Sequence, residues 1–440
     1  MAQKVISNTN SKEGASILQK FKRLILASQH LIAMFGATVL VPILTGFDPS
    51  IALIAAGCGT LIFHFCTKKK VPVFLGSSFA FIPVIISVAE SHNGDLTYAQ
   101  GGIVVAGIIY VILSFLVTKI GVENIKRFLP AQVVGPMIIV IGLNLIPTAF
   151  NMASENIMVA LITLSTALLI KFFSKGFVKQ LSILIAVFVG YLVSLKLGIV
   201  NTALISETPI FALPNFTLPK FDLSSILVIA PVVLAVLMEH VGDITTNGQV
   251  VGENFIEDPG LNRTLLGDGL ATIFSSLIGG PANTTYGENT GVLALTKNYD
   301  PSILRITAVI AIILGAFSKV GGVLQSIPSS VMGGISLILF SMIAMVGVKS
   351  IKNDNVTFNY KNIIVMGTIL FLGLGSGIIE RKFGVTIGIP VTETVKITGL
   401  SLSAIVGVAL NAIINRNELK VKNIEKIDEE NDEDIEILEA

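Results

Sequence analysis

Apolar stretches long enough to cross a membrane recur along the whole chain, and they restrict its fold more than any other feature does. Hydrophobic residues make up 52% of the 440 residues, and only 13% are charged. A helix that crosses the hydrocarbon core of a bilayer needs about 20 predominantly apolar residues. The sequence therefore predicts an all-α polytopic membrane protein with fourteen spans, near residues 24–45, 50–66, 71–91, 100–119, 128–149, 157–173, 179–197, 223–243, 263–279, 280–296, 303–321, 328–348, 361–379 and 389–414.

Basic residues indicate which ends of these spans face the cytoplasm, since Lys and Arg accumulate in cytoplasmic loops. With the N-terminus inside, the clusters at 68–70, 171–179 and 349–361 all fall inside, and an even number of spans returns the C-terminus to that side. Residues 1–23 are polar and carry no cleavable signal, so we expect the first span to be retained. The sequence predicts a multi-pass protein of the cell membrane with both termini in the cytoplasm and an acidic, disordered tail over residues 415–440.

Three pairs of similar segments occur in the same order in the two halves of the chain. Residues 129–137 resemble 327–335, residues 76–80 resemble 283–287, and Gln29-His30 resembles Glu239-His240, at separations of 198 to 210 residues. Each half holds seven predicted spans, and because seven is odd, the two halves enter the membrane from opposite sides. Inverted repeats around interrupted helices are typical of secondary transporters. A channel would lack such duplicated interruptions, and an intramembrane enzyme would need a converging nucleophile and base or a metal set.

Two of the similar segments, 76–81 and 283–289, interrupt apolar spans with glycine and hydroxyl residues. Irregular backbone at membrane depth is tolerated where it faces a cavity. In each segment we expect a short extended piece followed by a half-helix, so that free backbone N–H groups point to one central place. The rings of Phe79 and Tyr286 would lie beside it. Close helix packing is the alternative role for these small residues, but it does not explain the carboxylate of Glu288.

Acidic residues inside the apolar stretches are the candidate functional groups, because an ionisable side chain at bilayer depth is costly. Glu288 is the first of them. Glu239 and Asp243 are four residues apart and would share a helix face, with His240 about 100° away. A hydrated helix end is the alternative for both acids. Asp268 is either a hydrogen-bonded structural acid or part of a proton relay.

The remaining titratable residues add little. His30 is either a packing histidine or a support of the site. No group of His, Cys, Asp and Glu has metal-ligand spacing, and no Gly-rich phosphate loop with a following lysine occurs in the sequence. We therefore expect no metal, no organic cofactor and no enzymatic activity.

Motifs over nearly the whole chain carry a resemblance to a known family. They are Tyr-Gly-Glu-Asn-Thr-Gly-Val at 286–292 with Thr296, Ser-Gln-His at 28–30, Met-Phe-Gly-Ala-Thr-Val-Leu-Val-Pro at 34–42, Leu-Gly-Ser-Ser-Phe-Ala-Phe at 75–81, Glu-His-Val-Gly at 239–242, Asp-Pro-Gly at 258–260 and Val-Met-Gly-Gly at 331–334. With these motifs the chain resembles the nucleobase/ascorbate transporter family (nucleobase:cation symporter type 2), specifically its uracil permease branch. Purine-transporting members typically carry glutamine at the position of Glu288, and some uracil permeases carry histidine at that of Asp243.

This resemblance implies a fold of fourteen spans in two inverted repeats, with short extended segments in spans 3 and 10. It divides the chain into a core domain, residues 24–119 and 223–321, and a gate domain, residues 128–197 and 328–414. It also implies a homodimer formed through the gate domain.

The function that the resemblance implies is proton-coupled uptake of uracil by alternating access. Glu239 and Glu288 would bond the edge of the ring, the backbone N–H groups of Phe79 and Gly287 would meet its carbonyls, and Tyr286 would border the pocket. Proton coupling is expected at Glu239, Asp243 and Glu288, with support from His30, Asn289 and Asp268. The expected partners are uracil or a related nucleobase, a proton and the lipid bilayer, with no nucleic acid. A purine (xanthine-type) or a sodium-coupled nucleobase transporter is the alternative.

Overall fold

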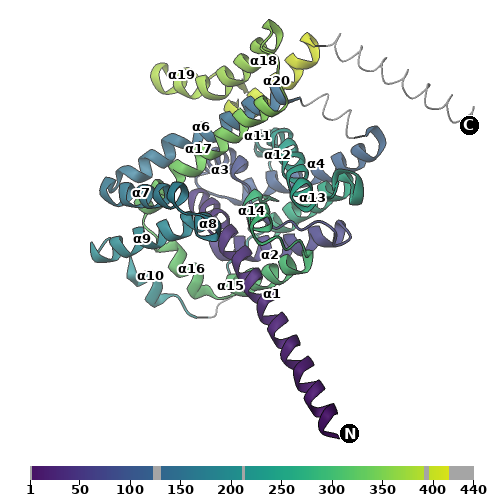
Figure 1. Cartoon of the computed structure of the whole chain (residues 1–440). Coiled ribbons are helices and arrows are strands. Elements are labelled where there is room, and N and C mark those ends of the chain that lie inside the picture. The colour runs from purple at the N-terminus through teal and green to yellow at the C-terminus, as the bar shows by residue number, and fades with distance from the viewer. Residues whose placement is uncertain (1, 122–129, 211–213, 391–395, 416–440) are drawn as a thin grey trace, which may run out of the picture.

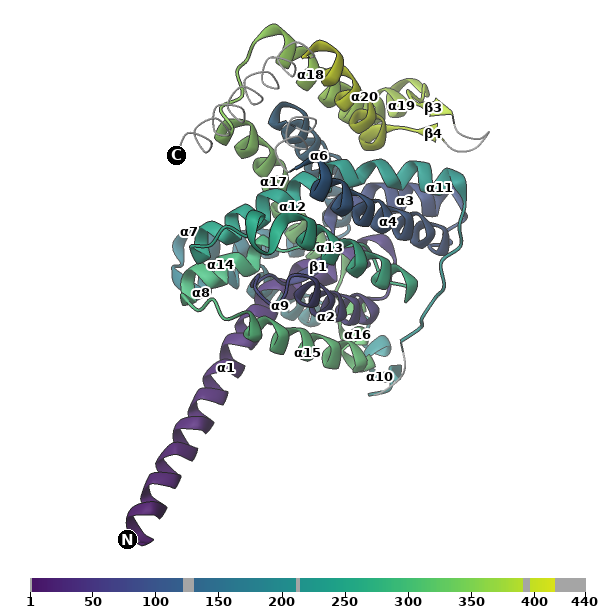
Figure 2. The same cartoon turned by 90° about the vertical axis from the view of Figure 1, so that its right-hand side faces the viewer.

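The computed structural model describes residues 2–121, 130–210, 214–390 and 396–415. Its elements are α1 (Ala2–Thr45), α2 (Pro49–Cys66), β1 (Leu75–Ser77), η1 (Phe79–Phe81), α3 (Ile82–Ser91), α4 (Thr97–Ile120), α6 (Ala131–Ser154), α7 (Ile157–Phe173), α8 (Gly176–Gln180), α9 (Ser182–Lys196), α10 (Thr202–Glu207), α11 (Leu223–Ile229), η2 (Ala230–Val232), α12 (Val233–Val251), η3 (Ile256–Gly260), α13 (Leu261–Leu277), β2 (Asn283–Thr285), α14 (Gly287–Thr296), α15 (Pro301–Ala316), α16 (Ser318–Gln325), α17 (Ser329–Asn353), α18 (Tyr360–Leu370), η4 (Phe371–Gly375), α19 (Ser376–Phe383), β3 (Ile389–Pro390), β4 (Lys396–Ile397) and α20 (Gly399–Ile414). The start of α1 projects from the body of the molecule, away from α18 and α20 (Figures 1 and 2).

Seven of the described helices are long and apolar enough to cross a membrane, or eight if α15 and α16, bent by 78° at their junction, form one span. Two other predicted spans are not continuous helices in the structure. Residues 71–91 fold as β1, η1 and α3, and residues 280–296 fold as β2 and α14. The structure thus has the helices of a multi-pass membrane protein, while the number fourteen stays a prediction. Of the predicted tail, residues 416–440 lie outside the described residues.

Helices α2 and α15 begin in the same way and pack against each other. Asp48 and Asp300 are their N-caps, and each carboxylate accepts a hydrogen bond of 2.8 Å from the backbone N–H two residues later. A proline follows each cap and suits the first helical position. Gly57 allows the close approach, because a Cβ there would lie 2.5 Å from the carbonyl oxygen of Ala308. Helix α2 also packs on α13, and α13 packs on α4.

The similar segments 129–137 and 327–335 lead into α6 and α17, with residue 129 outside the described residues, and these two helices pack together (Figures 1 and 2). Glycines set the distance between them: a Cβ at Gly142 would lie 2.5 Å from the Phe340 carbonyl oxygen, and one at Gly347 would lie 2.4 Å from the Gly135 oxygen. Helix α17 also packs on α7, and α18 and α20 pack on α6. These two similar segments from the two halves of the chain are therefore neighbours in space.

Candidate functional site

The two interrupted segments meet in a short antiparallel sheet in the interior of the molecule. Strand β1 pairs with β2 in the register Leu75 with Thr285, Gly76 with Thr284 and Ser77 with Asn283. The Ser78 N–H donates to the Ala282 oxygen (2.8 Å), and the Tyr286 N–H donates to the Phe74 oxygen (3.1 Å). All six strand residues are buried. The prediction of an extended piece in each of the segments 76–81 and 283–289 is confirmed. Backbone hydrogen bonds join the two strands.

The ring of Tyr286 lies over the first strand. A Cβ at Gly76 would stand 2.4 Å from its ring carbons, so only glycine leaves room for it there. The Tyr286 hydroxyl donates to the Ser77 carbonyl oxygen at 2.9 Å, and the Ser77 hydroxyl donates to the Thr38 carbonyl oxygen of α1 at 3.1 Å. This chain of bonds joins β2, β1 and α1, and it leaves Tyr286 only 4% exposed.

A helix follows each strand. Helix α14 begins at Gly287, directly after Tyr286, and carries Glu288 in its first turn. The short helix η1 begins at Phe79 and continues into α3. The first N–H groups of a helix have no partner inside the helix, and they form its positive end. Phe79 is half-buried, and its ring is 6.5 Å from that of Phe340 on α17, in an edge-to-face arrangement.

Three carboxylates come together around β2 and the start of α14. Asp243 on α12 accepts a hydrogen bond of 2.9 Å from the Thr285 hydroxyl, and a Cβ at Gly287 would lie 3.6 Å from its other oxygen. Glu239, one turn earlier, lies within electrostatic range of Glu288. All three acids are half-buried rather than fully buried. Helix α12 runs on to Val251, so Asp243 is not at a helix end.

The two predicted supporting residues His30 and Asn289 contact each other. The Asn289 amide nitrogen is 3.2 Å from both the carbonyl oxygen and the Nδ1 atom of His30, and both side chains are buried. This contact ties α1 to α14. Asp268 lies elsewhere, on α13, where its Oδ2 is 3.2 Å from Nδ1 of His240. The structure therefore pairs Asp268 with His240 of α12 rather than with a residue of the strand junction.

Several residues at the junction were not predicted from the sequence. The Asn247 amide nitrogen, one turn after Asp243, donates to the Pro72 oxygen and to the Thr290 hydroxyl, both at 3.1 Å. Its spacing of four from Asp243 was the available signal. Among the residues that the structure describes, no group of three or more His, Cys, Asp and Glu residues could hold a metal ion.

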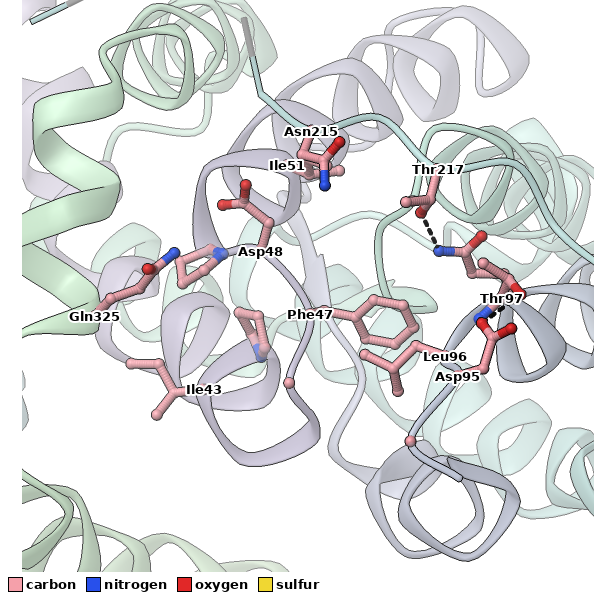
Figure 3. Close-up of a pocket in the computed structure, with 16 residues that line it drawn as sticks. Ile43, Phe47, Asp48, Ile51, Asp95, Leu96, Thr97, Asn215, Thr217 and Gln325 are labelled. Atoms are coloured by element: carbon pink, nitrogen blue, oxygen red, sulfur yellow. Dashed lines mark hydrogen bonds between the residues drawn. The ribbon is translucent and has the colours of Figure 1, made fainter. Parts of the chain in front are cut away.

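A pocket of about 530 Å³ lies away from the three carboxylates. It is bounded by the turn between α1 and α2, the loop before α4, the segment around Thr217 and the end of α16 (Figure 3). The Gln100 amide donates to the Thr217 hydroxyl at 2.5 Å on one wall. None of the acids predicted to bind substrate or protons lines this pocket.

Paired half-helices with carboxylates beside them, in a multi-pass helical protein, define a membrane transporter rather than an enzyme. Residues 21–380 match the family described as the permease family. The chain belongs to this family, the nucleobase/ascorbate transporter family that its motifs resemble.

Several curated relatives cover almost the whole chain. The chain is 39% identical to a probable uracil permease of Haemophilus influenzae, over 92% of this chain and 97% of the relative. It is also 39% identical to the uracil permease of Bacillus caldolyticus, over 91% of this chain and 93% of the relative. The uracil permease of Bacillus subtilis is 38% identical, over 88% and 91% of the two chains.

Solved structures show the same fold at low sequence identity. The transmembrane domain of the cyanobacterium bicarbonate transporter BicA matches with a TM-score of 0.61 and 16% identity, over 88% of this chain and 96% of that one. Murine Solute Carrier 26 family member A9, an anion transporter in the inward-facing state, matches with a TM-score of 0.64 and 10% identity, over 90% and 68%.

Proposed function

We propose that this protein takes up uracil across the cell membrane together with protons. The observation that carries the proposal is that Glu288 directly follows the paired strands and lies within range of the charge of Glu239, in a chain about 39% identical to uracil permeases. The printed names of these relatives favour a pyrimidine over a purine substrate.

The chemistry of the site suits a flat ring with N–H donors and carbonyl acceptors. An ionised carboxylate only accepts hydrogen bonds, so Glu239 and Glu288 would take the ring N–H groups. The N–H groups of Phe79 and Gly287, at the starts of two helices, would donate to the carbonyls. Tyr286 would border the ring. A site that pairs every polar edge rejects analogues, because a mismatch leaves its own buried groups without partners.

Alternating access would move two groups of helices against each other. Helices α2, α4, α13 and α15 pack together, as the predicted core domain requires, and α6, α7, α9 and α17 pack together, as the gate domain requires. The pairing of β1 with β2 and of α6 with α17 supports two inverted repeats. Fourteen spans, cytoplasmic termini and a homodimer through the gate domain are parts of this proposal.

The test is uptake of labelled uracil into proteoliposomes under an imposed pH gradient, with and without sodium. Each proton moved inward adds about 2.3 kcal/mol per 100 mV and about 1.4 kcal/mol per pH unit. These values support an accumulation of roughly tenfold to several hundredfold for one proton per uracil. An uncoupler should abolish it. Uptake that requires sodium and ignores the uncoupler would contradict proton coupling, and an absence of saturable uracil uptake would contradict the substrate.

A further inference from the structure

A second group of polar side chains lies behind α12, inside the helix bundle. Nδ1 of His240 and Oδ2 of Asp268 are 3.2 Å apart, and both side chains are fully buried. Tyr110 on α4 is also fully buried. The His240–Asp268 distance is that of an ion pair, but its geometry is not that of a hydrogen bond. Both ring nitrogens of His240, both oxygens of Asp268 and the Tyr110 hydroxyl have no hydrogen-bond partner among the described residues.

The backbone around Asp268 is built for close approach. A Cβ at Gly267 would lie 2.9 Å from a ring carbon of Phe63 on α2, and one at Gly269 would lie 2.8 Å from Cβ of Tyr110. These two glycines bring α13 against α2 and α4, and they place the carboxyl group of Asp268 between those helices and α12. The Phe63 ring, edge-to-face with His240 at 6.5 Å, is an apolar wall of the site.

Packing alone does not explain these residues. A buried polar group without a hydrogen bond costs about 1–3 kcal/mol, and an unpaired buried charge costs more. Apolar side chains of similar size would avoid this cost at three positions at once. A proton that neutralises the pair, together with buried water that bonds the remaining atoms, would satisfy all three side chains.

This buried group is electrostatically connected to the substrate site. Glu239 precedes His240 in α12 and lies within electrostatic range of both Asp268 and Tyr110. Asp243, also on α12, lies within range of Asp268. The charged or titratable groups that face the pair are therefore Glu239 and Asp243 from α12 and Tyr110 from α4, while α2 contributes the apolar Phe63.

We propose that His240, Asp268 and Tyr110 form a second proton-binding site, separate from the substrate and behind the carboxyl group of Glu239. The inference rests on the proposed function, because only a proton-coupled carrier needs such a site. Glu239 accepts an N–H from the ring most strongly when it is ionised, yet the proton must stay in the core domain while the substrate is bound. A second site removes this conflict.

The proton balance is simple. The carboxylic acid of Glu239 loses its proton and becomes a carboxylate that accepts the ring N–H. The proton passes to the Asp268 carboxylate beside neutral His240, so the net charge of the pair changes from minus one to zero. The Tyr110 hydroxyl keeps its own proton and would bond buried water beside Asp268. The total charge of the core domain does not change during this transfer.

The test compares Asp268→Asn and Tyr110→Phe with the parent protein in proteoliposomes. We expect both variants to bind uracil within about threefold of the parent and to exchange it in counterflow, because exchange needs no net proton movement. Accumulation driven by a pH gradient should fall at least tenfold, and the dependence of uracil affinity on pH should flatten. Tyr191→Phe is the matched control, because it removes a hydroxyl that bonds Ser326, far from the pair.

The outcomes separate the two proposals. If the parent does not transport uracil, the proposed function fails. If the parent accumulates uracil and both variants accumulate it equally with the same pH profile, only the second proton site is wrong. A parallel loss of binding, exchange and accumulation would assign the group a structural role and overturn the inference. Infrared difference spectra between acidic and neutral pH need no substrate: Asp268→Asn should remove one carboxylic acid band that the parent shows.

Discussion

At the scale of single residues, Glu288 differs from an ordinary helix-capping acid in its surroundings. It occupies the first turn of α14, where the helix dipole favours a negative charge. Glu239 on α12 lies close enough for its charge to act on Glu288, and the Lys171 ammonium on α7 also acts on Glu288 from beyond ion-pair distance. An acid held between a favourable helix end and a like charge is ready to accept a donor, which a nucleobase N–H would supply.

Replacing Glu288 tests this assignment. Glu288→Gln keeps the shape and loses the ionised acceptor, and a charge-assisted hydrogen bond is worth about 1.5–3 kcal/mol. Uracil affinity should fall roughly 10- to 150-fold. The control is Thr284→Ser, a conservative change on the neighbouring strand. Calorimetric titration of the purified proteins measures both, and unchanged affinity in Glu288→Gln would show that Glu288 does not bind the substrate.

Asp243 makes a separate prediction, because it contacts Thr285 rather than open water. If Asp243 forms a coupled pair with Glu239, one turn earlier, the proton that couples to transport belongs to the pair. Asp243→Asn keeps an oxygen for the Thr285 hydroxyl and removes the charge. The pH optimum of uptake should therefore shift while uracil binding at acidic pH changes less than about threefold. An unchanged pH profile would remove Asp243 from proton coupling.

A site residue could be predicted from the sequence only where its residue type is rare in an apolar stretch. Glu239, Asp243 and Glu288 are acids in apolar runs, and their cost at bilayer depth made them visible. Tyr110 is ordinary in an apolar helix, so nothing in the sequence connected it with Asp268. Contacts between distant helices depend on packing that no local spacing encodes.

At the scale of secondary structure, the strand pair of β1 and β2 is the element on which the site depends. Its register joins residues about 200 positions apart. The sequence predicted two extended pieces from their glycine and hydroxyl residues, but the register follows from tertiary contacts such as the Tyr286 ring on Gly76. The sequence likewise predicted one span over 303–321, whereas the structure bends between α15 and α16.

Gly76→Ala tests whether this register positions the site. The added methyl group would stand 2.4 Å from the Tyr286 ring and 2.8 Å from the Thr38 hydroxyl, so the ring must move. Overpacking of this kind costs about 1–3 kcal/mol. We expect a lower Tm and at least a tenfold loss of uracil affinity, since a tenfold change is about 1.4 kcal/mol.

Gly367→Ala on α18 is the matched control, because a Cβ there meets no atom within 4 Å. Because alanine restricts the unfolded chain more than glycine does, this variant should have an unchanged free energy of unfolding or one raised by about 0.4–1 kcal/mol. Equal Tm and affinity in Gly76→Ala and the parent would mean that the Tyr286 ring does not hold the strand pair in place.

At the scale of the whole molecule, the two halves are joined by an extended segment, residues 214–222, that crosses the loop before α4. The Lys220 N–H donates to the Thr97 oxygen at 2.9 Å, and the Lys220 ammonium donates to Asp95 at 2.8 Å. The Lys220 ammonium also lies 5.4 Å from the centre of the Tyr98 ring. These contacts attach the start of the second half to the first half beside the pocket of Figure 3.

The attachment should depend on pH in a defined direction. The Lys220 ammonium, helped by the Thr97 hydroxyl, holds the pKa of Asp95 at about 2, below the usual value of about 3.9. A lowered carboxyl pKa contributes stability above the unfolded pKa, and this contribution is lost as the pH falls through the folded pKa.

Asp95→Asn removes the titrating group and leaves Lys220 beside Tyr98. Its Tm should therefore lie below that of the parent at pH 7, and the difference should disappear near pH 2. Glu90→Gln, an exposed acid at the end of α3, is the control and should show no such difference. A Tm difference of the same size at pH 2 and pH 7 would mean that the Asp95 charge does not hold the two halves together.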